Sequence, residues 1–148
     1  GLGEQAVCVE QMTAKACRKE LQKIRETIGT VTEEPAVFFR IPGGEYNNEV
    51  LRTIYACGSY PVAWSVDSMD WKEYEAGELV KQMLQTHTLR DGEILRFHAE
   101  GENTGEMVKL LHPRLKEEGY EAVTVSQMVY KDRYRMTTDG RQIPEKSK

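Results

Sequence analysis

Residues 61–98 read PVAWSVDSMDWKEYEAGELVKQMLQTHTLRDGEILRFH, and this stretch decides the fold. It opens with a short apolar run at 61–66 and closes with another at 93–98. Between these runs, residues 75–89 place apolar side chains at helical spacing. A strand, a helix and a second strand in this order predict two parallel strands joined by a crossover helix.

The same alternation continues on both sides of this stretch. Upstream, the pattern predicts a helix over 12–28, a strand over 36–41 and a helix over 47–57. Downstream, we expect a helix over 104–118 and a fourth strand over 121–125. Continuous apolar strands separated by amphipathic helices are typical of a parallel sheet with flanking helices. The sequence therefore predicts an α/β fold.

The composition narrows the class of protein. The chain has 148 residues, 39% hydrophobic and 30% charged, as expected for one ordinary globular domain. No window approaches the about 20 apolar residues that span a bilayer. Asp and Glu (24) outnumber Lys and Arg (20), and the net charge of −4 argues against a nucleic-acid binder held by phosphate contacts. The three cysteines form no C-x-x-C pair, so neither a disulfide framework nor a thiolate zinc site is indicated.

The chain is expected to hold one domain over residues 1–129, followed by a polar tail over 130–148. The tail is rich in turn residues, and we expect it to be frayed. The chain opens Gly1-Leu2-Gly3, with neither an initiator Met nor a signal peptide. We expect this start to be an interior cut or a processed end.

Polar side chains follow the ends of three predicted strands. Arg40 lies near the end of the first, Asp67 and Asp70 follow the second, and His98 ends the third. Because the carboxyl ends of parallel strands meet at one edge of a sheet, these side chains should gather there. Each residue alone is explained more simply as an ion pair or a helix cap. Together on one edge, they favour a functional site.

Several motifs resemble a known family. Residues 39–47, FRIPGGEYN, resemble the third motif, R-x-P-[YG]-G-x-x-N, of polysaccharide deacetylases of the NodB-homology type, carbohydrate esterase family 4. Residues 67–71, DSMDW, are similar to the fourth motif, and residues 94–98, ILRFH, to the fifth. Residues 118–126, EGYEAVTVS, are similar to the closing strand of the family. The motifs match in order and spacing.

The resemblance implies a partial distorted (β/α)7 barrel and a deacetylase chemistry. The family removes acetyl groups from chitin oligomers, peptidoglycan or related glycans, and uses a divalent metal such as zinc. By resemblance, His98 is the general acid, Asp70 orients it, and Arg40 pairs with the catalytic base. Trp71 would wall the acetyl pocket, while Tyr46 and Asn47 fall in the substrate loop.

The departures from the family pattern concern the metal and the base. The first motif, T-F-D-D-G, which supplies the base and one metal ligand, is absent from this sequence. Gln5 and Val9 stand where the second motif has its two metal-binding histidines. Gln is a poor zinc ligand and Val is none. Arg96 stands where the family usually has a Leu of the acetyl pocket. We therefore expect no metal ligand and no cofactor for this chain, and no hydrolysis by it.

Three accounts of these residues stay open. In the first account, the chain is a pseudo-enzyme that retains a glycan-binding or structural domain. In the second account, it is an active deacetylase completed by an upstream segment or a partner chain. In the third account, it is an ordinary α/β binding module whose polar edge is structural. By resemblance, the partner is an acetylated glycan and the location extracytoplasmic, at the cell envelope. An open sheet edge also predicts a homodimer.

Overall fold

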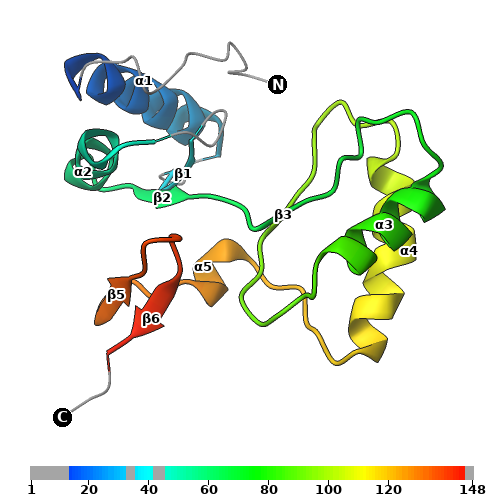
Figure 1. Cartoon of the computed structure of the whole chain (residues 1–148). Coiled ribbons are helices and arrows are strands. Elements are labelled where there is room, and N and C mark those ends of the chain that lie inside the picture. Colours follow the sequence, from blue (N-terminus) through cyan, green and yellow to red (C-terminus); the bar gives the residue numbers. More distant parts are fainter. Residues whose placement is uncertain (1–13, 33–35, 42–45, 146–148) are drawn as a thin grey trace. The chain divides into compact units, whose positions relative to one another are not determined.

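The computed structural model describes residues 14–32, 36–41 and 46–145 (Figure 1). The chain divides into two compact units, Gly1–Ala63 and Trp64–Lys148. We call these the first unit and the second unit and describe each by itself.

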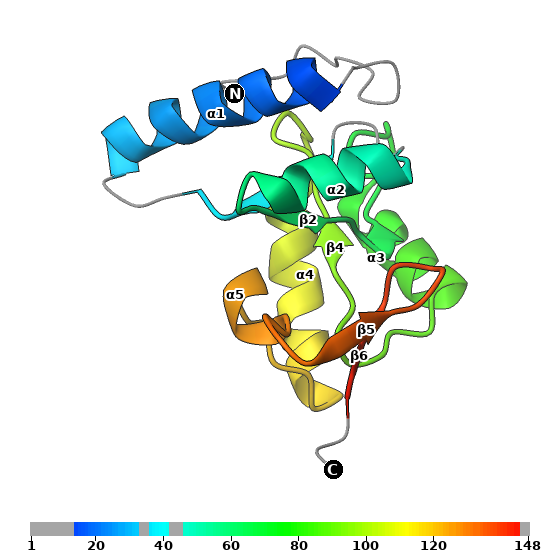
Figure 2. The same cartoon turned by 90° about the vertical axis from the view of Figure 1, so that its left-hand side faces the viewer.

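The first unit contains two helices and a pair of parallel strands. Helix α1 (Ala14–Thr32) precedes strand β1 (Phe38–Arg40), and helix α2 (Asn48–Ala56) precedes strand β2 (Tyr60–Val62). The strands pair in parallel, with Phe38 opposite Tyr60. Helices α1 and α2 lie side by side (Figure 2). The predicted strand–helix–strand order is therefore present in this unit.

The core of the first unit follows from helical spacing. Cys17 and Leu21 lie four residues apart on α1, and Val50 and Ile54 lie four apart on α2. All four are buried and pack together with Ile41. Residues four apart share one face of a helix, so each helix buries one apolar face against the other.

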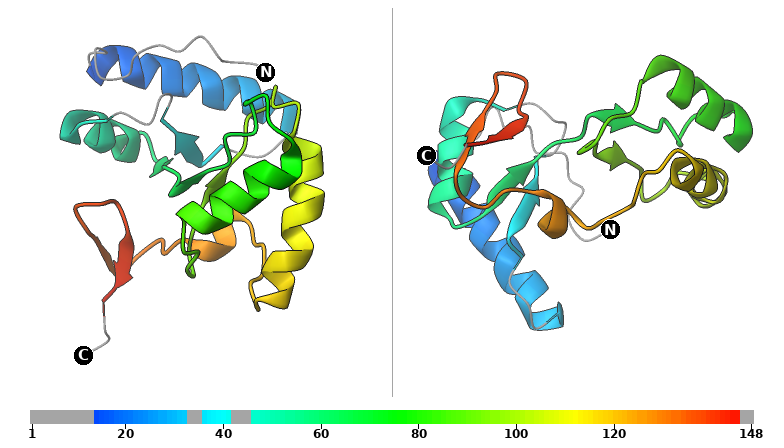
Figure 3. Two further views of the ribbon diagram at one scale, coloured as in Figure 1. Left: turned by 45° about the vertical axis from the view of Figure 1, so that its right-hand side comes forward. Right: turned by 90° about the horizontal axis from the view of Figure 1, so that it is seen from below.

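The second unit repeats the pattern. Strand β3 (Val66–Asp67), helix α3 (Ala76–Thr86), strand β4 (Leu95–Arg96) and helix α4 (Thr104–Glu117) follow in order. Strands β3 and β4 are parallel, with Asp67 opposite Arg96. Helices α3 and α4 lie against each other (Figure 3). Their core is apolar and buried, and it consists of Val66, Ala76, Leu79, Val80, Met83, Met107 and Leu111.

Two sequence predictions about strands differ from the structure. The strand expected over 61–66 is two strands, β2 and β3, which pair with different partners. The prediction of a strand over 121–125 is wrong, because these residues form no strand and are largely exposed. Thr124 instead caps the short helix α5 (Val125–Met128), and its hydroxyl and the Gln127 side chain form a capping box.

The C-terminal region also differs from expectation. Residues expected to be a frayed tail contain an antiparallel hairpin of strands β5 (Tyr134–Met136) and β6 (Gln142–Pro144). The Asp139-Gly140 turn explains the hairpin, since Gly140 adopts a positive φ of 82°. The domain boundary at residue 129 stays a prediction. Among the described residues, no helix is long and apolar enough to cross a membrane.

Candidate active site

Asp70 and His98 meet beyond the carboxyl ends of strands β3 and β4. Because these strands are parallel, the segments that follow them leave from the same edge of the sheet. The His98 ring nitrogen Nδ1 lies 2.6 Å from Asp70 Oδ1. The His98 backbone N–H also donates to the same carboxylate, at 3.0 Å to Oδ2 and 3.3 Å to Oδ1. The sequence prediction that these two residues gather on one edge is confirmed.

The Asp70 carboxylate is buried but well supplied with hydrogen-bond donors. Its side chain has no exposed surface. It also accepts a hydrogen bond from the Thr104 hydroxyl, at the first residue of α4. Burial raises the pKa of the Asp70 carboxyl, but the hydrogen bonds from Thr104 and His98 outweigh it. The net pKa lies below the ordinary value, so Asp70 is ionised at neutral pH.

The ionised Asp70 carboxylate determines which ring nitrogen of His98 carries the hydrogen that lies between the two side chains. A carboxylate can only accept hydrogen bonds, so Nδ1 of His98 carries the hydrogen between them. The other ring nitrogen, Nε2, is then the one available to a substrate. The His98 side chain is 25% exposed, so the ring reaches the surface. Trp71 lies beside it, with ring centroids 6.5 Å apart in an edge-on arrangement.

A tight turn after β3 presents Asp70. Asp67 Oδ1 accepts a hydrogen bond from the Met69 N–H at 2.9 Å, and Met69 has a positive φ of 53°. Asp residues favour such turns because the side chain replaces a backbone acceptor. Asp67 is also joined to Arg96 at 3.3 Å, and the Arg96 guanidinium lies 4.1 Å from the Trp64 ring centroid. Asp67 therefore has a structural role in shaping the turn.

Sequence reasoning missed two residues of this site. The sequence predicts only that a helix begins at Thr104, whereas the Thr104 hydroxyl donates a hydrogen bond to Asp70. Gly101 lies against the same carboxylate, and a Cβ at this position would lie 2.5 Å from Thr104 Oγ1 and closer still to Asp70 Oδ2. The signals in the sequence are a glycine three residues before the expected helix and a threonine at its first position.

Three of the predicted site residues belong to the first unit. Arg40 is the last residue of β1 and is exposed. Tyr46 is 40% exposed. Asn47 caps α2, because its Oδ1 accepts a hydrogen bond from the Val50 N–H at 2.9 Å. The structure brings together Asp70, His98 and Trp71 in the second unit, and the roles of the other three stay predictions.

The described residues do not provide a metal site. Across 14–32, 36–41 and 46–145, no three side chains of His, Cys, Asp or Glu are grouped to hold a metal ion. Gln5 and Val9, which the resemblance predicts at the positions of the family's metal-binding histidines, lie outside the described residues. Side chains of these two types cannot replace two imidazole ligands of a zinc ion.

Comparison with known proteins gives several relatives, although no protein-family model matches the chain. It is 31% identical over 121 residues to a peptidoglycan-N-acetylglucosamine deacetylase of Listeria monocytogenes, covering 80% of this chain and 25% of that protein. It is 32% identical over 102 residues to a peptidoglycan-N-acetylglucosamine deacetylase of Bacillus cereus, covering 66% of this chain and 46% of that protein. The chain thus spans less than half the length of either relative.

Solved structures are similar in fold. A carbohydrate esterase family 4 pseudoenzyme from Bacillus anthracis superposes with a TM-score of 0.77 at 23% identity, covering 84% of this chain and 43% of that one. A mutant of that protein with restored enzymatic activity is equally similar in structure, with a TM-score of 0.77. The fold expected from the sequence, part of a distorted (β/α)7 barrel with parallel strands and flanking helices, is confirmed.

Proposed function

Because these 148 residues belong to a polysaccharide deacetylase domain of the NodB-homology type, in carbohydrate esterase family 4, we propose that they bind an acetylated glycan beside His98. The observation that carries this proposal is the contact of 2.6 Å between the buried Asp70 carboxylate and His98 Nδ1. This geometry supports the role of a general acid held by a carboxylate, the arrangement that a deacetylase needs at its leaving group.

The chemistry of the pair can be stated atom by atom. Asp70 keeps the hydrogen on Nδ1, so a protonated His98 offers its second proton from Nε2. When an acetamide is cleaved, that proton passes to the nitrogen as the carbon–nitrogen bond breaks, and the amine leaves neutral. Asp70 fixes the orientation of the ring throughout this transfer.

We propose further that these 148 residues bind the glycan without hydrolysing it. Hydrolysis also requires a base for the attacking water, and in this family a divalent metal that polarises the acetyl group. Gln5 and Val9 cannot serve as the two imidazole ligands, and the T-F-D-D-G motif is not in the sequence. The existence of a family 4 pseudoenzyme of similar fold supports this account.

A second account is favoured by a specific observation. The Asp70–His98 pair is fully formed, with Thr104 and Gly101 fitted around it, although a binding module has no need of a general acid. In this account the domain is an active deacetylase whose base and metal ligands come from an upstream segment or a partner chain.

Acetate release and glycan binding distinguish the accounts. The 148 residues, alone and within the whole protein to which they belong, are incubated with N-acetylated chitotetraose and with peptidoglycan fragments, with and without zinc. Saturable binding that is weakened by Trp71→Ala, with no acetate above the blank in either form, supports the non-hydrolytic proposal. Acetate release that is lost in His98→Gln establishes the active account. If the protein neither binds glycan nor releases acetate, both accounts are contradicted and the account of an ordinary α/β module remains.

The proposals for the type of glycan and for the cellular location rest on the relatives. The relatives from Listeria and Bacillus cereus are named for peptidoglycan, which favours a peptidoglycan strand over other acetylated glycans. An extracytoplasmic location follows from that substrate. The predicted homodimer gains no support from the comparisons, and light scattering of the purified chain tests it directly.

A further inference from the structure

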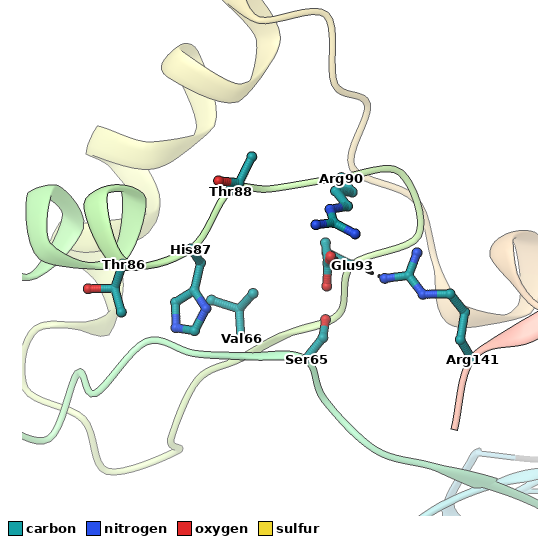
Figure 4. Close-up of a pocket in the computed structure, with 8 residues that line it drawn as sticks. All are labelled: Ser65, Val66, Thr86, His87, Thr88, Arg90, Glu93 and Arg141. Carbon is teal, nitrogen blue, oxygen red and sulfur yellow. Dashed lines mark hydrogen bonds and ion pairs between the residues drawn. The ribbon is translucent and has the colours of Figure 1, made fainter. Parts of the chain in front are cut away.

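We propose that a pocket at the amino ends of β3 and β4 binds the carboxylate of a small organic acid. The pocket has a volume of about 320 Å³ and lies within the second unit. Its walls come from the start of β3, the end of α3, the turn before β4 and the turn of the β5–β6 hairpin (Figure 4). A pocket of this size matches the lower end of small-molecule sites.

The pocket is separate from the Asp70–His98 site. It is lined by Ser65, directly before β3, and by Glu93, two residues before β4. Asp70 and His98 follow the carboxyl ends of the same two strands. Since β3 and β4 are parallel, the two sites lie beyond opposite ends of the strand pair. The pocket and the proposed glycan site therefore share no residue.

Positive charge exceeds negative charge at one end of the pocket. Figure 4 shows Arg90, Glu93 and Arg141 gathered there. Arg141 pairs with Glu93 at 3.3 Å, and the Glu93 side chain is only 13% exposed. Among the described residues, the Arg90 guanidinium has no hydrogen-bond or ion-pair partner. Two guanidinium groups face one carboxylate, so a single negative charge would balance this end.

The charge and the donor geometry select a carboxylate. A guanidinium presents a planar pair of N–H donors that matches the two oxygens of a carboxylate or a phosphate. Phosphate monoesters carry about 1.5 to 2 negative charges at pH 7, and Glu93 would repel the second charge. A carboxylate carries one charge, so it can bind Arg90 without that repulsion.

The other end of the pocket accommodates the body of the acid. Val66 lies at the base of the pocket with 2% of its surface exposed, and Thr86 and His87 lie at the end opposite the arginines (Figure 4). The Thr88 hydroxyl also lines the pocket, without a hydrogen-bond partner in the described part of the chain. A short aliphatic acid would place its carboxylate at Arg90 and its hydrocarbon chain toward Thr86 and His87.

A titration with butanoate tests this proposal. The ¹⁵N-labelled 148-residue chain is titrated with sodium butanoate at constant ionic strength, and the amide shifts are followed by NMR. We expect saturable shifts at residues 87–93 and at Arg141, with a Kd on the order of 10 mM. Arg90→Gln should raise the Kd at least about fivefold, because it removes the guanidinium fork. Butanamide, the neutral analogue, should give no saturable shift.

Two controls make the result specific. Arg114→Gln, at an exposed position of α4, should leave the Kd for butanoate unchanged. Inorganic phosphate should bind more weakly than butanoate, and Glu93→Gln should strengthen phosphate binding. The proposal is overturned by an absence of saturation, by an unchanged Kd in Arg90→Gln, or by tighter binding of phosphate than of butanoate to the unaltered chain.

Discussion

Asp70 accepts hydrogen bonds from both the ring and the backbone of a single residue, His98. The ring nitrogen Nδ1 lies 2.6 Å from Oδ1, and the backbone nitrogen lies 3.0 Å from Oδ2. The ring contact sets the orientation of the imidazole, and the backbone contact holds the chain just beyond β4. One buried carboxylate therefore determines both the position and the hydrogen placement of the proposed general acid.

Asp70→Asn should destabilise the protein and disturb His98. An amide places an N–H₂ group where the carboxylate accepts hydrogen bonds from Thr104 or His98, so at least one donor is left facing another donor. We expect a loss of about 2 kcal/mol in the free energy of unfolding, measured by urea denaturation. The ring ¹⁵N shifts of His98 should also change. Asp91→Asn, at an exposed position, serves as the control, and an equal effect there would contradict the prediction.

The stability should depend on pH through Asp70. The pKa of this carboxyl is lowered in the folded protein, whereas the unfolded chain has an ordinary value of roughly 3.9. The unfolded state therefore binds the proton more readily as the pH falls. The stabilisation is present above about pH 4 to 5 and is lost as the pH drops through the folded pKa.

A comparison with Asp70→Asn isolates this contribution, because all other groups are shared. The difference in unfolding free energy between the two proteins should be largest near neutral pH and should shrink below about pH 4. Urea denaturation between pH 7 and pH 2.5 measures it. A difference that stays constant over this range shows that Asp70 has the same pKa in both states.

Gly101 should not tolerate a side chain. A Cβ at this position would lie 2.5 Å from Thr104 Oγ1 and against Asp70, and neither of these groups can move without breaking the hydrogen bond between them. We expect Gly101→Ala to cost about 1 to 3 kcal/mol of stability, measured by thermal and urea unfolding. It should also change the His98 ring shifts.

Gly105 provides the matched control. It lies four residues further along, inside α4, and a Cβ there would meet no atom within 4 Å. Gly105→Ala should therefore stabilise the protein by up to about 1 kcal/mol, because alanine is the better helix former. Similar effects of the two substitutions would show that the close contact at Gly101 is not a constraint.

The sequence predicted the helices, whose apolar residues repeat at helical spacing. It did not predict correctly the strands whose existence depends on a partner strand. Helices α2 and α3 were predicted within about two or three residues of their observed ends, because their apolar residues repeat at helical spacing. The strand expected over 121–125 failed because no described strand pairs with it, and its apolar residues alone cannot replace a partner. The hairpin of β5 and β6 was missed because each strand has only three residues, too few to show an alternating apolar pattern.

The sequence predicted only those site residues whose positions follow from the two parallel strands. Asp70 and His98 were expected together because both follow parallel strands, and the structure confirms their contact. Thr104 and Gly101 were not expected as partners of Asp70, because their contact depends on how the loop before α4 folds back. Loop conformation of this kind leaves little trace in the composition of a short segment.

The proposal that the chain is not hydrolytic predicts a low zinc content. Purified protein is incubated with equimolar zinc, freed of excess metal and measured by elemental mass spectrometry. We expect below about 0.1 zinc per chain, because Gln5 and Val9 replace imidazole ligands. The double variant Gln5→His, Val9→His places two imidazoles at i and i+4 and should raise the bound zinc clearly, whereas Gln5→Asn, Val9→Leu should not. One zinc per unaltered chain would mean that other residues supply the ligands, and it would favour the account of an active deacetylase.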